Sequence, residues 1–224
     1  MKHIVVLTGA GMSAESGVKT FRDHDGLWEG HDVMQVASPQ GFEANPELVL
    51  DFYNQRRRQL KDVQPNAAHL ALAQLEQDYK VSIVTQNVDD LHERAGSSNV
   101  LHLHGELKKV RSTGNPNDIK DWTDDLSLGD TCEKGYQLRP HVVWFGEAVP
   151  MMEKAVEVCY TADVLVIIGT SMQVYPAASL MHYVPSSIPK FYIDPKPALS
   201  TSENITVIAK TATEGIRDLL ERLP

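Results

Sequence analysis

Two histidines near the middle of the chain are candidates for acid–base chemistry. In residues 100–105 apolar and polar residues alternate, so His102 and His104 share one face of a strand and leucines occupy the other. Two histidines at this spacing could hold a metal, but a third ligand at suitable spacing is not evident. A general base beside a structural histidine is the better interpretation, since an imidazole with a pKa of about 6.5 suits a base near neutral pH.

Polar side chains also gather where an apolar run ends. Gln86, Asn87 and Asp89 come directly after the apolar run 81–84. Open α/β sheets bind ligands beyond the carboxyl ends of their strands, so these side chains would meet a ligand there. One such residue alone would more often cap a helix N-terminus, whereas three together favour a binding site.

A glycine-rich turn follows the first apolar run, at residues 4–7. Backbone N–H groups and a helix N-terminus would face a pyrophosphate at the turn formed by Gly9, Ala10, Gly11 and Ser13. A tight strand-to-helix turn without a ligand explains this fragment equally well, and residues 16–23 do not continue into the second strand that usually follows. The turn alone is a weak signal.

Positioning these residues requires a parallel sheet with helices between its strands. Short apolar, β-branched runs recur at residues 4–7, 81–84, 164–168, 191–193 and 205–208. Helical patterns lie between several of them, at residues 66–77, 89–95, 151–160 and 213–223. This alternation predicts an α/β fold with a Rossmann-like, doubly wound parallel sheet.

Two stretches interrupt the alternation. Residues from about 24 to 65 have a mostly helical pattern, and residues 111–139 are polar and lack an apolar period. We expect them to form a smaller lobe over the carboxyl edge of the sheet. The predicted division is a discontinuous Rossmann-like domain of residues 1–24, 66–110 and 140–224, and a small lobe of residues 25–65 and 111–139.

Composition limits the partners and the compartment. The chain has 224 residues and a formal net charge of -9, which argues against broad affinity for nucleic acid or anionic membranes, because both need clustered Lys and Arg. Its two cysteines, Cys132 and Cys159, give no disulfide framework. The opening apolar run is too short for a secretion signal or a membrane span. We expect a cytoplasmic protein without nucleic-acid or membrane partners, and a monomer is compatible with the sequence.

Short motifs occur in the order in which sirtuins carry them, at residues 9–13, 16–18, 21–22, 85–89, 104–105, 145–147 and 169–171. Each motif is weak alone, but the ordered series is specific and spans essentially the whole chain. The sequence thus resembles the sirtuin family of NAD-dependent protein-lysine deacylases. The resemblance implies that an acyl-lysine carbonyl oxygen attacks the ribose carbon that carries nicotinamide, and that the products are nicotinamide, O-acyl-ADP-ribose and free lysine.

The resemblance also implies an NAD site and its residues. His104 matches the catalytic base of the family, and Asn87 and Asp89 match residues that hold nicotinamide and ribose in line for the reaction. The residues that match the cofactor site are Gly9, Ala10, Gly11, Ser13, Phe21, Arg22, Gln86, Asn87, Asp89, Gly169, Thr170, Ser171, Asp194 and Ala212. Phe21 would shield the reactive ribose from water. Asp194 replaces the asparagine of many relatives, and its charge would disfavour NADP.

The implied partner is an acyl-lysine protein or peptide. It would enter as an added strand between two walls of the site, in contact with Val143, Phe145, Gly146, Glu147 and Val174. Residues 143–147 are equally compatible with an ordinary edge segment that buries its aromatic residues.

An arginine interrupts an apolar helix face that begins near Pro46. One stripe at i, i+4 spacing is formed by Leu48, Phe52, Arg56 and Leu60. The guanidinium of Arg56 either extends to solvent, pairs with an internal acid, or awaits an acidic ligand. The next two residues, Arg57 and Arg58, are expected in solvent.

Tyr53 and Arg56 resemble the residue pair with which desuccinylase-type sirtuins bind the acyl carboxylate. This resemblance implies succinyl-, malonyl- or glutaryl-lysine as good substrates, with acetyl-lysine as a further candidate.

The chain departs from the family in its small lobe. Sirtuins normally carry four cysteines that bind a structural zinc, and only Cys132 lies in that region here. Asp130 and His141 are poor substitutes, because tetrahedral zinc needs four well-placed ligands. We predict a metal-free lobe in which Trp122, Ile119 and Leu126 pack residues 111–139 on the sheet domain.

Two other functions are compatible with an NAD site. A protein ADP-ribosyltransferase would transfer the sugar to a protein side chain, but the arginine that would bind the acyl group argues against it. A non-catalytic NAD sensor is disfavoured by the intact set of His104, Asn87 and Asp89.

Overall fold

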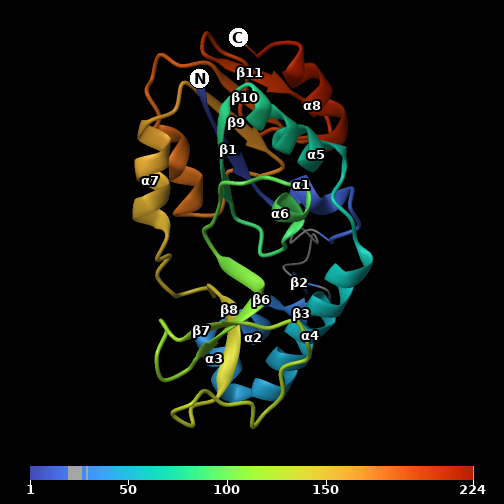
Figure 1. Cartoon of the computed structure of the whole chain (residues 1–224), viewed down its shortest axis with the longest axis vertical. Coiled ribbons are helices and arrows are strands. Elements are labelled where there is room, and N and C mark those ends of the chain that lie inside the picture. The colour runs from blue at the N-terminus through green and yellow to red at the C-terminus, as the bar shows by residue number, and fades with distance from the viewer. Residues whose placement is uncertain (20–26, 29, 224) are drawn as a thin grey trace.

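Six parallel strands form a sheet in one half of the computed structural model, which describes residues 1–19, 27–28 and 30–223 (Figure 1). The strands are β1 (His3–Thr8), β4 (Lys80–Thr85), β5 (Val100–His102), β9 (Val164–Ile168), β10 (Lys190–Ile193) and β11 (Ile205–Ile208). Their order is β11-β10-β9-β1-β4-β5, so the chain builds outward on one side of β1 and then on the other. The predicted doubly wound parallel sheet is confirmed.

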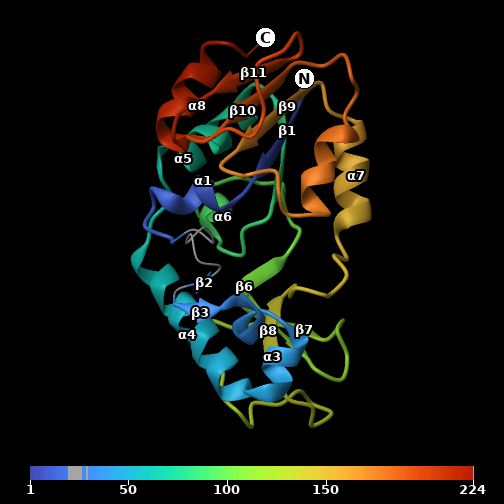
Figure 2. The same ribbon diagram turned by 180° about the vertical axis from the view of Figure 1, so that it is seen from behind.

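Helices cover both faces of this sheet, which is why its strands are apolar throughout. One face carries α1 (Ala10–Ala14), α5 (Ala67–Gln74) and α8 (Ala212–Leu220), which pack on side chains that include Ile4 and Val6. The other carries α7 (Met152–Tyr160) and the 3₁₀ segment Ala177–His182, which pack on Val5 and Leu7 (Figure 2). The predicted helices are confirmed, with ends that differ by a few residues.

The other half combines helices with a three-stranded antiparallel sheet. The sheet has the order β7 (Ile119–Asp121), β6 (Gly105–Ser112), β8 (Leu138–Val142). The helices are α2 (Val33–Val36), α3 (Pro39–Ala44) and α4 (Pro46–Asp62), and a short ribbon pairs β2 (Leu27–Trp28) with β3 (His31–Asp32). Strands β6 and β8 run across residues 110 and 139, where domain boundaries were predicted. The division into domains stays a prediction.

Helix α4 carries the predicted apolar stripe. It begins where Asn45 Oδ1 accepts the N–H of Leu48 at 3.1 Å and Pro46 occupies the first helical position. Phe52 and Leu60 are buried in a cluster with Trp144. The stripe thus attaches the helix to the sheet strand β8 and the chain that follows it.

The prediction that Arg57 lies in solvent is wrong. Its side chain is 1% exposed, with Nε donating to the Leu107 carbonyl at 3.1 Å and Nη1 donating to Asn54 Oδ1 at 2.7 Å. Helix α4 packs against β6, so a second face of the helix is buried and these acceptors replace water. Burial lowers the pKa of Arg57 to about 10, and the group stays charged at neutral pH. Arg58 is exposed, as predicted, and pairs with Asp125 at 2.5 Å.

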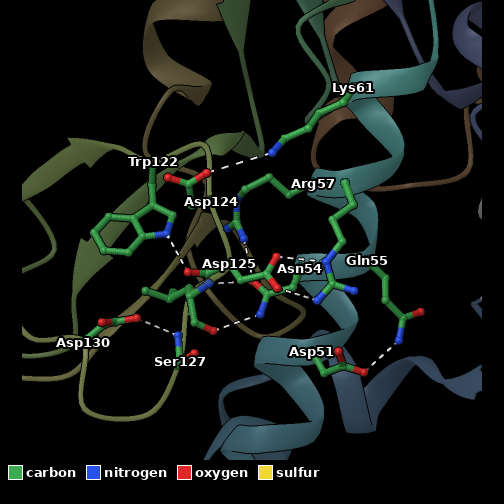
Figure 3. A network of polar contacts seen from close by, with 12 residues as sticks. Asp51, Asn54, Gln55, Arg57, Lys61, Trp122, Asp124, Asp125, Ser127 and Asp130 are labelled. Atoms are coloured by element: carbon green, nitrogen blue, oxygen red, sulfur yellow. Dashed lines mark hydrogen bonds and ion pairs between the residues drawn. The ribbon is translucent and has the colours of Figure 1, made fainter.

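Polar contacts connect residues 111–139 with helix α4. Figure 3 shows Asn54, Arg57 and Lys61 directed from the helix toward the loop that carries Asp124 and Asp125. Asn54 accepts the N–H of Leu126 at 2.8 Å and donates to its carbonyl at 3.0 Å.

The apolar anchors of this segment are only partly those predicted. Leu126 is buried and Trp122 packs partly, in a cluster on helix α4 that also includes Leu50 and Cys132, rather than on the parallel sheet. Ile119 is 42% exposed, so its predicted packing is wrong. It lies on the edge strand β7, which has three residues and presents one face to solvent.

In the region where sirtuins normally carry zinc, Cys132 and Asp130 take part in hydrogen bonds within the protein. Ser112 Oγ donates to Cys132 Sγ at 3.3 Å, and Asp130 accepts the N–H of Ser127 at 2.7 Å. Within the described residues, no three His, Cys, Asp or Glu side chains gather in a way that could hold a metal ion. The metal-free lobe stays a prediction. Over the same part of the chain, no helix is long and apolar enough to cross a membrane.

Candidate active site

The carboxyl ends of β1 and β9 meet where the strand order reverses, which is where ligands bind in such sheets. Gly9 N–H donates to the Ile168 carbonyl at 3.1 Å, and Gly11 N–H donates to the Gly169 carbonyl at 2.8 Å. A Cβ on Gly11 would lie 2.7 Å from Gly169 Cα, and Gly169 has a φ of 62°. Only glycine fits this close approach of the two loops.

Asn87, Ser13 and Asp89 form a buried chain of hydrogen bonds beneath this turn. Asn87 Nδ2 donates to the Gly9 carbonyl at 3.0 Å and to Ser13 Oγ at 3.1 Å, and Ser13 Oγ donates to Asp89 Oδ2 at 2.9 Å. Asp89 also accepts the N–H of Leu91, the first residue of α6 (Leu91–Arg94), at 3.2 Å. Burial raises the pKa of Asp89, although both hydrogen bonds act to lower it.

Gln86 connects the loops that follow β4 and β9. Its Nε2 donates to Thr170 Oγ1 at 3.1 Å, and its backbone N–H donates to the Thr8 carbonyl at 2.9 Å. Thr170 is held in turn, because its carbonyl accepts the hydroxyl of Tyr192 at 2.9 Å. Three of the sequence motifs therefore meet at one sheet edge.

His104 lies beside this edge, in the residues between β5 and β6. Its Nδ1 is 3.1 Å from the Gln86 carbonyl. A carbonyl only accepts, so Nδ1 carries the proton and Nε2 is the basic nitrogen. Burial lowers the pKa of His104, which keeps the ring neutral at pH 7.

His102 has a different environment. Its Nδ1 is 2.9 Å from the Asn87 carbonyl, and its Nε2 is 2.7 Å from Glu93 Oε1. Glu93 lies on α6 and was not predicted, because only the packing of that helix against β5 brings it to His102. The interpretation of one base and one structural histidine agrees with this contrast.

The predicted peptide wall follows β8. Val143 N–H donates to the His104 carbonyl at 2.8 Å, and Phe145 is 41% exposed. Gly146, with a φ of 89°, turns the chain. Val174, which is predicted to form the opposite wall, is 36% exposed.

The half-buried carboxylate of Glu147 is held by two arginines and a backbone N–H. It accepts Arg139 Nη1 at 2.7 Å, Arg111 Nη2 at 2.9 Å and the Trp144 N–H at 2.8 Å. Burial raises the pKa of Glu147, but the hydrogen bonds from Arg139 and Trp144 outweigh it, so the pKa is lowered. These two arginines were not predicted from the sequence, because they lie on separate strands of the antiparallel sheet.

Tyr53 and Arg56 occupy adjoining positions on α4. Tyr53 is buried, and its hydroxyl accepts Trp144 Nε1–H at 2.9 Å. Burial raises the pKa of Tyr53 well above its usual value. Arg56 is half-buried, with Nη1 donating to the Phe52 carbonyl at 2.7 Å and the guanidinium 3.7 Å from the Phe52 ring centre. It borders a cavity that is also lined by Gln59, Val88, Asp89 and Leu107.

The other predicted cofactor residues lie along the same edge or outside the described chain. Ser171 follows Thr170, and Ala212 is the first residue of α8. Asp194 is buried after β10, and its Oδ1 accepts the N–H of Lys196 at 2.8 Å. Phe21 and Arg22 lie outside the described residues.

Comparison with known proteins decides the family. The sequence model of the Sir2 family matches residues 9–176, about three quarters of the chain. The chain belongs to the Sir2 family. An NAD-dependent protein deacylase of Helicobacter pylori is 58% identical over 224 residues, which are 100% of this chain and 98% of that protein. One of Bacteroides thetaiotaomicron is 53% identical over 230 residues, which cover 100% of this chain and 98% of that protein.

Solved Sir2 structures share the fold. A Sir2 homologue in complex with NAD is 41% identical, with a TM-score of 0.89 over 99% of this chain and 89% of that one. A Sir2 mutant with a deacetylated p53 peptide and 3′-O-acetyl-ADP-ribose is 28% identical, with a TM-score of 0.80 over 98% of this chain and 92% of that one. These findings confirm the predicted family, its NAD cofactor and its class of enzyme, the NAD-dependent protein deacylases. The roles of single residues and the acyl group stay predictions.

Proposed function

We propose that this Sir2-family chain removes acyl groups from protein lysines with NAD, and that succinyl-, malonyl- and glutaryl-lysine are good substrates alongside acetyl-lysine. The names of the relatives support the deacylase activity. The observation that carries the choice of acyl group is Arg56, a half-buried guanidinium that borders the same cavity as Asp89.

The pyrophosphate binds beside Gly9 and Gly11, because this turn leads into the N-terminus of α1 at the switch point of the sheet. NAD supplies the ribose carbon that is attacked and the nicotinamide that leaves. Asn87 and Asp89 orient the nicotinamide and ribose end, because their hydrogen bonds to Gly9 and Ser13 fix them in one arrangement.

His104 acts as the general base. Its Nδ1–H is engaged with the Gln86 carbonyl, so Nε2 takes a proton from a ribose hydroxyl. The lowered pKa favours the neutral ring that this step needs. The contact between His104 and the Gln86 carbonyl thereby joins the base to the loop that positions the cofactor.

The substrate backbone adds as a strand beside residues 143–147, with Val174 on the opposite side. The exposure of Phe145 and Val174 supports this path, as does the deacetylated p53 peptide in a related Sir2 structure. Glu147, tied to Arg111 and Arg139, stabilises this wall and contacts the peptide through its backbone.

A carboxylate at the end of the acyl chain would pair with Arg56. One charge-assisted hydrogen bond contributes about 1.5–3 kcal/mol, or roughly 10- to 150-fold in kcat/KM. Tyr53, fixed by Trp144, adds a second polar group at the adjoining helix position.

The test compares Arg56→Met with Arg58→Met, an exposed arginine on the same helix. The Arg56 variant should lose at least about tenfold in kcat/KM for succinyl-peptide and keep its rate on acetyl-peptide. The Arg58 variant should match wild type on both peptides. Equal or better succinyl turnover by Arg56→Met would overturn the assignment of the acyl group.

A further inference from the structure

The side chain of His102 lies between two hydrogen-bond acceptors. His102 ends β5, with Nδ1 2.9 Å from the Asn87 carbonyl and Nε2 2.7 Å from Glu93 Oε1. Two residues later, His104 Nδ1 contacts the Gln86 carbonyl at 3.1 Å. The two histidines therefore hold successive carbonyls of the loop that carries the cofactor residues.

The two partners of His102 fix the charge of its ring. A backbone carbonyl and an ionised carboxylate can only accept hydrogen bonds. A neutral imidazole has one N–H, so it would satisfy one partner and direct a lone pair at the other. Only an imidazolium donates to both, whereas His104 needs one proton for its contact.

The groups around His102 favour that charge. Glu93 on α6, Asp89 in the loop before it and Glu106 on β6 are the acids that face the ring, and His92 on α6 is a further titratable neighbour. Burial lowers the pKa of His102, but the hydrogen bond and the charge of Glu93 outweigh it, so the pKa is raised. In return, the hydrogen bond from His102 outweighs burial and lowers the pKa of Glu93.

We propose that His102 and Glu93 form an imidazolium–carboxylate pair that positions Asn87 for NAD. His102 holds the carbonyl of Asn87, while the side chain of Asn87 donates to the Gly9 carbonyl and to Ser13. Loss of the carbonyl contact leaves the backbone of Asn87 held only through its N–H, which donates to Thr85 Oγ1 at 3.0 Å. His102 is a positioning residue, and its effect on turnover rests on the proposed function.

Glu93→Gln removes the negative charge of residue 93 but keeps a hydrogen-bond partner for His102. The amide of a glutamine can donate to Nε2 of a neutral His102, whose Nδ1–H then still reaches the Asn87 carbonyl. Wild type should lose kcat/KM for NAD on the alkaline side, because the one proton left on a neutral His102 stays on Nε2, beside the charged carboxylate of Glu93, and Nδ1 then directs a lone pair at the Asn87 carbonyl. In Glu93→Gln this alkaline decrease should disappear, with activity at pH 7 within about threefold of wild type.

Two further variants complete the kinetic test. His102→Phe removes the contact and should raise KM for NAD by about tenfold, with a smaller effect on KM for peptide. Glu153→Gln, an exposed site on α7, is the matched control and should keep the wild-type profile. An alkaline decrease that persists unchanged in Glu93→Gln would overturn the proposal.

The charge of His102 can be measured without turnover. In ¹⁵N-labelled protein at pH 7, both ring nitrogens of His102 should carry protons, with the signals assigned by their loss in His102→Phe. The same spectrum should show one protonated nitrogen for His104. A single protonated nitrogen on His102 at pH 7 would contradict the pair, whether or not the protein proves to be a deacylase.

Discussion

At the scale of residues, His102 at the end of β5 and His104 two residues later differ in the hydrogen-bond partners of their rings. His104 contacts one acceptor and its pKa is depressed by burial, whereas His102 contacts an acceptor on each nitrogen. The alternation of residues 100–105 predicts one base and one structural histidine, and the base role of His104 stays a prediction. It could not predict Glu93, because a contact between a strand and a helix depends on packing that a local pattern does not contain.

If His104 is the general base, activity should decrease at acid pH. The step needs the neutral ring, so kcat/KM should fall as pH drops through the pKa of His104, which burial holds below 6.5. A pH–rate profile gives the midpoint of the decrease in kcat/KM, and an NMR titration of the His104 ring, assigned with His104→Tyr, gives the midpoint of the ring's protonation. The two midpoints should agree, and a ring titration above 6.5 would contradict this account.

At the scale of elements, helix α4 has two buried faces, of which the sequence pattern indicated one. The apolar stripe with Phe52 and Leu60 was predictable from its spacing. The second face, with Asn54 and Arg57, was not, because its partners are backbone groups of β6 and of the loop at Leu126. Residues 111–139 likewise depend on distant partners, since Leu126 bonds to Asn54 and Ser112 pairs with Leu138 on the neighbouring strand.

The role of Asn54 predicts a large loss of stability. Asn54→Ala would remove two hydrogen bonds to Leu126 and an acceptor of Arg57, leaving buried donors without partners. We expect the free energy of unfolding to fall by about 2–4 kcal/mol. The control is Gln55→Ala on the exposed face, which should change it by less than about 0.5 kcal/mol. Urea denaturation measures both, and similar values for the two variants would refute the role of this contact.

At the scale of the whole molecule, a parallel sheet provides one edge to which distant motifs converge (Figure 1). This part was predictable because its strands are buried on both faces and therefore read as continuous apolar runs. The antiparallel sheet was not predicted, since β6 and β8 pair across a long polar segment. Its register and the two arginines around Glu147 arise only from the tertiary structure.

The absence of the family's zinc cysteines predicts a lobe that folds without metal. Elemental analysis of the purified protein should find far less than one zinc per chain, and a chelator should leave the unfolding temperature unchanged. The cluster of Leu50, Val110, Leu126 and Leu138 would then supply the packing that a metal gives elsewhere. Stoichiometric zinc, or unfolding by the chelator, would show that other ligands replace the cysteines.

The most direct test of the central claim is mass spectrometry of acetyl- and succinyl-lysine peptides incubated with and without NAD. With wild-type protein, the account predicts loss of the acyl group only when NAD is present, with nicotinamide and O-acyl-ADP-ribose formed in equal amounts. His104→Tyr should form neither product. Acyl loss without NAD, an ADP-ribosylated peptide, or full activity in His104→Tyr would contradict the account.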